Sequence, residues 1–329
     1  MSRRLVPALA LLLALGWLAP AVAAAAAGDE SAGTRAAAFL GGGSSPEVLG
    51  MGGATLALSR DVQGAGWNPA ALAWLAGPQL VLAHTELADQ ASQEWAGFAG
   101  RLHLGDARVG LAALYRDEGT IAGRDANNLP TGDVAANDLA LTLQLARPFG
   151  ERLSAGGAMH FVSQRIGDDG GVGAAFDAGA QLRLGLFSLA LSGRDFGGSM
   201  HWDGQRWRMP ATLGAGAAFE HAPSGLRLAL DLAAPADYFR SVHVGAEWRW
   251  RDRLALRTGW QRALGAPGTD PMDGPSFGLG AGAGAMWFDY AYVLSEGGAA
   301  THRLGLSWRG AAPGAATPPA APPASEPER

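Results

Sequence analysis

The sequence of 329 residues contains no cysteine. It therefore forms no disulfide, and an exported chain of this length must be held by a large core or by closed strand pairing. Beyond its N-terminal region it also lacks any run of about 18 apolar residues, which excludes a transmembrane helix there. The net charge of -5 is modest and spread along the chain, so the sequence gives no sign of nucleic-acid binding.

Recognisable catalytic and metal-binding motifs are also missing. The seven histidines show no pair at metal-ligand spacing, so we expect no metal site. GxSxG and HExxH are absent. The glycine-rich run 278–282 precedes no helical pattern, so it indicates a closely packed strand rather than a phosphate loop. We expect no catalytic residue and no cofactor; a barrel lipase whose Ser and His meet only in space stays a remote alternative.

The two ends of the chain have distinctive compositions. Arg3 and Arg4 precede a Leu/Ala-rich run that ends at Ala27. This pattern predicts a signal peptide over residues 1–27, cleaved among residues 23–27. An uncleaved membrane anchor is the alternative, which Pro20 and the alanine-rich exit disfavour. Residues 310–329 are rich in Ala and Pro, which predicts a disordered periplasmic tail.

Between these ends, apolar and polar residues alternate with a period of two. Leu139, Leu141, Leu143 and Leu145 are one example. With 49 glycines, the chain disfavours long helices. We predict an all-β fold, a transmembrane barrel over residues 79–309 with about 14 antiparallel strands of about nine to eleven residues. The expected strands lie near 80–86, 93–103, 107–116, 136–147, 151–165, 173–184, 186–195, 211–219, 224–233, 240–250, 252–262, 276–285, 286–295 and 300–309.

The predicted connections fall into two classes that alternate. Tight turns are expected at 104–106, 149–150, 184–186, 250–253 and 285–286, and longer loops at 117–135, 196–210, 234–239 and 263–275. Outer-membrane barrels have this asymmetry, whereas a soluble sandwich has no reason to sort its loops. Tryptophans near strand ends predict an interfacial girdle, with packing in a soluble core as the alternative. They are Trp248, Trp250, Trp260, Trp287 and Trp308.

Residues 28–78 carry strong local signals but no strand pattern. Asn68 is suited to cap a helix that begins at Pro69. A barrel of about fourteen strands is too wide for its own side chains to fill. We therefore predict that this segment is a plug inside the lumen. Its motif residues are Gly50, Met51, Gly52, Gly53, Trp67, Asn68, Pro69 and Ala70.

Charged and polar residues occupy the positions that alternation assigns to the lumen. Buried charges need partners or water. They either pair with one another and hold the plug, the interpretation we favour, or contact a substrate directly. The set is Asp138, Asp177, Gln181, Arg183, Arg227, Asp231, His243, Glu247, Arg249, Arg257 and Asp289.

Several segments resemble the PorV/PorQ family of the FadL-like outer-membrane β-barrel superfamily. They include LGMGGA and WNPAAL in the plug, FDAGAQLRL, RMPATLGAGAAF, VGAEWRWRDRLALRTGW and FDYAYVLSEGGAATHRLGLSW, while GRDFGG stands where the family has an Asn-Leu-Gly version. The resemblance covers roughly residues 35–309. It implies a plugged barrel in the cell outer membrane of a Gram-negative-type bacterium.

The resemblance leaves two functions open. FadL-like relatives pass hydrophobic small molecules across the outer membrane. PorV-like relatives are carriers or docking partners in a protein secretion system. The partners we expect are outer-membrane lipids with either hydrophobic small molecules or secreted or periplasmic proteins, and no nucleic acid.

Overall fold

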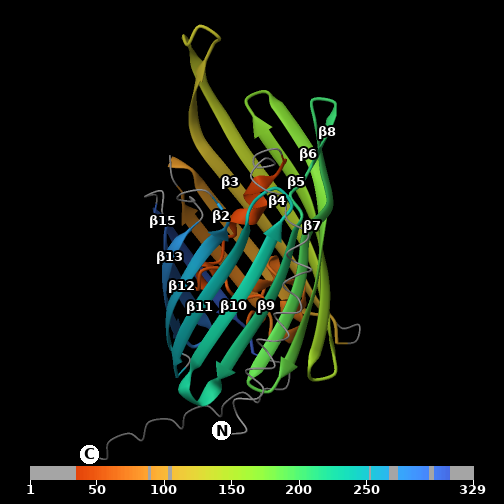
Figure 1. Ribbon diagram of the computed structural model, residues 1–329, viewed down its shortest axis with the longest axis vertical. Coiled ribbons are helices and arrows are strands. Elements are labelled where there is room, and N and C mark those ends of the chain that lie inside the picture. Colours follow the sequence, from red (N-terminus) through yellow and green to blue (C-terminus); the bar gives the residue numbers. More distant parts are fainter. Residues whose placement is uncertain are drawn as a thin grey trace, which may run out of the picture.

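The computed structural model describes residues 35–87, 90–102, 106–251, 253–266, 273–295 and 300–311. These residues form one antiparallel sheet of 15 strands that closes on itself (Figure 1). The expected signal peptide and all but the first two residues of the expected tail lie outside the described residues. No helix in the described part is long and apolar enough to span a membrane.

The wall strands run in chain order around the barrel. They are β1 (Gln79–Glu86), β2 (Ser92–Arg101), β3 (Arg108–Arg124), β4 (Pro130–Phe149), β5 (Leu153–Ile166), β6 (Asp169–Leu184), β7 (Phe187–Trp202), β9 (Thr212–His221), β10 (Leu226–Pro235), β11 (Arg240–Trp250), β12 (Leu254–Leu264), β13 (Gly274–Ala283), β14 (Met286–Leu294) and β15 (Ala300–Arg309).

Closure results from the pairing of β1 with β15 and of β6 with β7. The remaining strand, β8 (Gln205–Arg208), pairs with the far end of β7 and extends the wall there. The barrel proper therefore has 14 strands, which confirms the predicted all-β class and strand number. In the closed part of the barrel, each of the 14 described strands pairs on both sides, which is what a bilayer requires.

The outer wall is apolar and the lumen side is polar or small. On β4, Leu139, Leu141, Leu143 and Leu145 are exposed, whereas Gln144 between two of them is buried. The same alternation along the other strands covers the outside of the barrel with exposed aliphatic and aromatic side chains. A contiguous apolar surface of this extent needs lipid around it.

One tryptophan departs from the predicted girdle. Trp248, Trp250, Trp260 and Trp308 are exposed on the outer wall, but Trp287 is buried and faces the lumen. The guanidinium carbons of Arg249 and Arg309 lie 5.2 and 5.3 Å from its ring centroid. Assigning Trp287 to the girdle was wrong because strand alternation places it beside the inward Asp289.

Two of the predicted long loops are mostly strand. β3 and β4 continue through residues 117–135 past a register shift at Asp117/Thr120, and β7 and β8 form a hairpin within 196–210. Backbone ladders hold these hairpins and need no apolar side chain, so apolar alternation did not mark the segments as strands. Figure 1 shows the β3–β4 hairpin rising above the barrel. The 263–275 loop lies partly outside the described residues.

The segment before β1 lies inside the barrel (Figure 1). Its short helices are η2 (Ala38–Gly42), α2 (Pro46–Leu49), η3 (Gly64–Gly66) and η4 (Pro69–Trp74). Leu72 and Val62 are fully buried and cluster with Val81, Ala99 and Ala146 of the wall. Because the facing wall residues are so small, the segment packs directly on the sheet.

Candidate functional site

The glycine-rich bend of the plug lies against β11, β12 and β13. Gly52 and Gly53 have φ values of 65° and 81°, which side chains rarely adopt. A Cβ on Gly52 would lie 2.6 Å from the backbone nitrogen of Trp260. Ser276 accepts the Gly52 N–H at 2.9 Å, and His243 donates to the Gly52 carbonyl at 2.7 Å. Glycine is therefore needed here for both conformation and close approach.

Asn68 anchors the other end of the plug to β6. Its carboxamide oxygen accepts the Ala70 N–H at 3.1 Å, and its NH2 group donates to the carbonyls of Leu56 and Ala180, each at 3.3 Å. The side chain is fully buried, and the wall offers a glycine, Gly179, where a Cβ would lie 2.0 Å from it. Asn68 thus caps η4 and also links two plug segments to the wall.

A cluster of arginines and carboxylates joins the plug to the wall on the side of β10–β15. Glu247 lies at its centre and pairs with Arg227 at 3.1 Å, Arg249 at 3.2 Å and Arg257 at 2.7 Å. Glu47 of the plug pairs with Arg249 at 3.4 Å and with Arg257 at 3.7 Å. The wall surrounds Glu247 with three arginines. The plug therefore adds a second carboxylate, Glu47, to a cluster in which arginines predominate.

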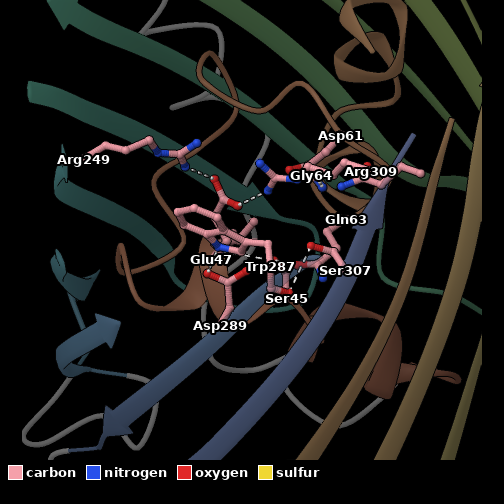
Figure 2. Close-up of polar contacts among 12 residues, drawn as sticks. Ser45, Glu47, Asp61, Gln63, Gly64, Arg249, Trp287, Asp289, Ser307 and Arg309 are labelled. Carbon is pink, nitrogen blue, oxygen red and sulfur yellow. Dashed lines mark hydrogen bonds and ion pairs between the residues drawn. The ribbon is translucent and has the colours of Figure 1, made fainter. Parts of the chain in front are cut away.

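Two further residues complete this network. Asp289 accepts from Arg257 at 2.6 Å and from the Trp287 indole at 2.8 Å. Arg309 lies 3.9 Å from Glu47. Figure 2 shows Glu47 between Arg249 and Arg309, with Asp289 beside Trp287. Sequence reasoning missed Glu47 and Arg309, because the register of the plug against the wall is not visible in one sequence.

The remaining lumen residues of the predicted set make separate contacts. Asp231 accepts the Leu56 N–H at 2.8 Å, and Asp138 accepts from Gln164 at 2.8 Å. Arg183 stacks over the Trp74 ring, with its guanidinium carbon 3.7 Å from the centroid. The remaining contacts are those of Gln181 with Leu56 and Ser59, His243 with Gly52, and Asp177 with His160. Most of these contacts hold the plug, but they do not form one network.

Two plug carboxyls have opposite pKa shifts. Burial alone would raise the pKa of Glu47, but the arginines around it, Arg257 first, outweigh burial and lower the pKa to about 2. Burial, reinforced by the nearby Glu47 carboxylate, raises the pKa of Asp61 to about 6. Figure 2 places Asp61 with Gly64, whose N–H it accepts, beside Arg309. Glu47 is therefore ionised throughout the neutral and mildly acidic range, whereas Asp61 keeps its proton up to a pH of about 6.

Asp61 should make the barrel less stable as the pH rises from about 4 to about 7. In that window the unfolded chain releases a proton that the folded protein keeps, so the free energy of unfolding falls. We expect a loss of about 3 kcal/mol, since the pKa of Asp61 rises from 3.8 to about 6 and each pKa unit corresponds to about 1.4 kcal/mol. Urea unfolding in lipid vesicles across this pH range measures it. Asp61→Asn should reduce the slope by this contribution, whereas Asp133→Asn, at an exposed hairpin position, should leave it unchanged.

A cavity of about 70 Å³ lies between the plug and strands β2–β7. Its apolar lining includes Trp67 and Leu40 from the plug and Trp95, Ala112 and Leu114 from the wall. Its polar lining includes Thr142, His160, Asp177, Arg194 and Asp195. Apolar and aromatic side chains together with a few polar groups are typical of a small-molecule site. Of the predicted residues, only Trp67 and Asp177 reach it.

The fold is shared with solved structures of hydrocarbon channels. The structure described as the CymD monoaromatic hydrocarbon channel matches with a TM-score of 0.64 and 14% identity, over 82% of this chain and 98% of that one. The Ralstonia pickettii toluene transporter TbuX gives a TM-score of 0.59 at 14% identity over 81% and 98%, and the P. putida toluene transporter TodX gives 0.60 at 13% over 80% and 98%.

These similarities show that the chain shares the fold of these solved channels, which in this chain is a closed antiparallel barrel of 14 strands with an N-terminal segment that is not strand. At such low identity they establish the fold and not the cargo. A scan of protein-family models finds no match, and a search of curated proteins finds no significant similarity.

Proposed function

We propose that this protein is an outer-membrane channel that binds and passes hydrophobic small molecules, of the size of a single aromatic ring. The observation that carries the proposal is the cavity between plug and wall, where Trp67 and Trp95 provide aromatic surface. The structurally similar proteins described as toluene transporters and monoaromatic hydrocarbon channels support it.

The cavity volume adds a mechanical requirement. An apolar protein cavity that binds benzene has a volume of about 150 Å³, whereas this one measures about 70 Å³. A ring-sized ligand therefore needs the plug residues around Trp67 to shift. This part of the plug is not fully enclosed by its surroundings. Gly66 has open space beside it, and Trp67 is only half-buried. This part of the plug is the segment we expect to move.

The outer wall behind the cavity also suits an apolar ligand. A groove of about 660 Å³ lies over β4–β7 and is lined by Leu141, Phe161, Val172 and Phe176. It covers the place where the β6–β7 register is interrupted. A ligand that leaves the lumen near this interruption would meet apolar surface facing lipid rather than water.

Filling the cavity should block uptake. Ala112 of β3 lines it, so Ala112→Phe should reduce uptake of radiolabelled toluene into proteoliposomes at least about tenfold, the equivalent of about 1.4 kcal/mol. Ala113→Phe places the same ring on the lipid-facing side of the next residue and should leave uptake unchanged. Both variants should still show the heat-dependent gel shift of a closed barrel. Equal uptake by both variants would refute a route through this cavity.

A PorV-like docking role is the second candidate. The hairpins β3–β4 and β7–β8 project from the barrel and expose Leu129 and Trp207. If these tips dock a secreted protein, Leu129→Glu with Trp207→Glu should abolish co-purification of that protein and leave toluene uptake intact. Loss of uptake without loss of a bound protein supports the channel instead.

A further inference from the structure

We propose that His160, Asp177 and Asp195 form a binding site for a divalent transition-metal ion on the inner wall of the barrel. The three residues lie on the adjacent strands β5, β6 and β7, and all three are buried. One ligand atom from each, a ring nitrogen or a carboxylate oxygen, lies within 4.8 Å of the others.

A β-bulge places the third ligand. Phe176 pairs with Phe196 and Ala178 with Gly193, so Asp177 alone faces two residues of β7. One of them, Asp195, has a φ of 55°. Bulges re-aim side chains, and here both Arg194 and Asp195 line the lumen cavity instead of alternating across the wall.

The hydrogen bonds orient the first two ligands as a metal site requires. Thr142 Oγ lies 2.9 Å from His160 Nδ1, and His160 Nε2 lies 2.8 Å from one oxygen of Asp177. The other Asp177 oxygen accepts the Asp195 backbone N–H at 2.8 Å. A metal-bound histidine normally donates its second ring N–H to an oxygen, and the Thr142 hydroxyl is placed to accept from Nδ1. A metal ion would then replace the proton that Nε2 and Asp177 share in this structure.

The Asp195 carboxylate is the observation that points to a cation. Its residue is 7% exposed, and among the described residues no hydrogen bond or ion pair holds its side-chain oxygens. It lines the cavity next to a second carboxylate, Asp177. With His160 neutral, as metal coordination requires, the two buried carboxylates carry two negative charges, which Arg194 offsets only in part. A divalent ion would neutralise the cluster and satisfy Asp195.

The donor set selects the class of metal. One imidazole nitrogen and two carboxylate oxygens suit zinc and neighbouring transition metals, whereas calcium and magnesium favour all-oxygen sites. Three protein ligands leave a coordination position open, and the cavity gives it room for a water molecule or for an oxygen of a bound ligand. The proposed metal site is argued from the geometry of the wall strands alone, so it does not depend on the proposed transport.

The test uses the untagged full chain in detergent micelles, stripped of metal with a chelator and titrated calorimetrically with Zn²⁺. We expect one Zn²⁺ per barrel and at least about tenfold weaker binding in Asp195→Asn, the scale on which supporting residues already act at metal sites. Asp138→Asn is the control because Asp138 is also a buried lumen carboxylate but lies outside the cluster. Co²⁺ should give visible absorption bands in the wild type and the control only.

A folding defect in Asp195→Asn would show as loss of the heat-dependent gel shift. In that case Thr142→Val decides, since it removes only the hydroxyl that orients His160 and should weaken Zn²⁺ binding by about tenfold. Absence of stoichiometric binding in the wild type, or equal binding by wild type and both variants, would overturn the site.

Discussion

Arg257→Ala should lower the free energy of unfolding of this barrel by about 3–5 kcal/mol, the range for removing one partner of a buried ion pair. The Arg257 side chain is fully buried and pairs with Glu247 at 2.7 Å and with Asp289 at 2.6 Å. Alanine would leave these carboxylates buried with less positive charge around them. Urea unfolding in lipid vesicles, followed by tryptophan fluorescence, measures the change.

The matched control is Arg251→Ala. Arg251 is exposed in the turn after β11 and contacts only the Trp250 ring, at 5.3 Å, among the described residues. We expect its replacement to change stability by less than about 0.5 kcal/mol. If Arg257→Ala cost no more than this control, the charge network would not hold plug and wall together, and the plug would depend on its apolar packing alone.

The sequence predicts the wall of this protein well because strand alternation is a local property. β4 and β11 follow directly from leucines or valines at every second position, and register then fixes which side chains face the lumen. The same reasoning assigned Glu247, Arg257 and Asp289 to the inside. It failed for Trp287. This residue lies near a strand end, which suggested the girdle, but it is two residues from the inward Asp289 and therefore shares its face of the strand.

Contacts between distant segments are not visible in one sequence. Glu47 meets Arg257 only after the plug has entered a closed barrel. His160, Asp177 and Asp195 are brought together by three neighbouring strands and a bulge, so no spacing motif marks them. The plug itself was predictable from a global argument, the unfilled lumen of a wide barrel. Its individual contacts were not.

Deleting residues 44–75 should convert the barrel into an open pore. This segment fills the lumen: Leu72, Val62 and Asn68 are fully buried, and Leu56 packs against the wall. The wall strands pair with one another without it, so we expect a folded barrel. The single-channel conductance in a planar bilayer should rise severalfold above that of the intact protein, because the pore of about fourteen strands is no longer filled.

The deletion should also make the pore select anions. It removes Glu47, which faces Arg249 and Arg309 in the intact protein, and leaves those arginines lining the lumen. The reversal potential under a KCl gradient reports this preference. Glu47→Gln is the control, since it removes the same charge but keeps the plug, and it should stay at the low conductance of the intact protein. Equal conductance of the deletion variant and this control would mean that the segment does not close the pore in the bilayer. Movement of the plug near Trp67 could then not control passage through the barrel.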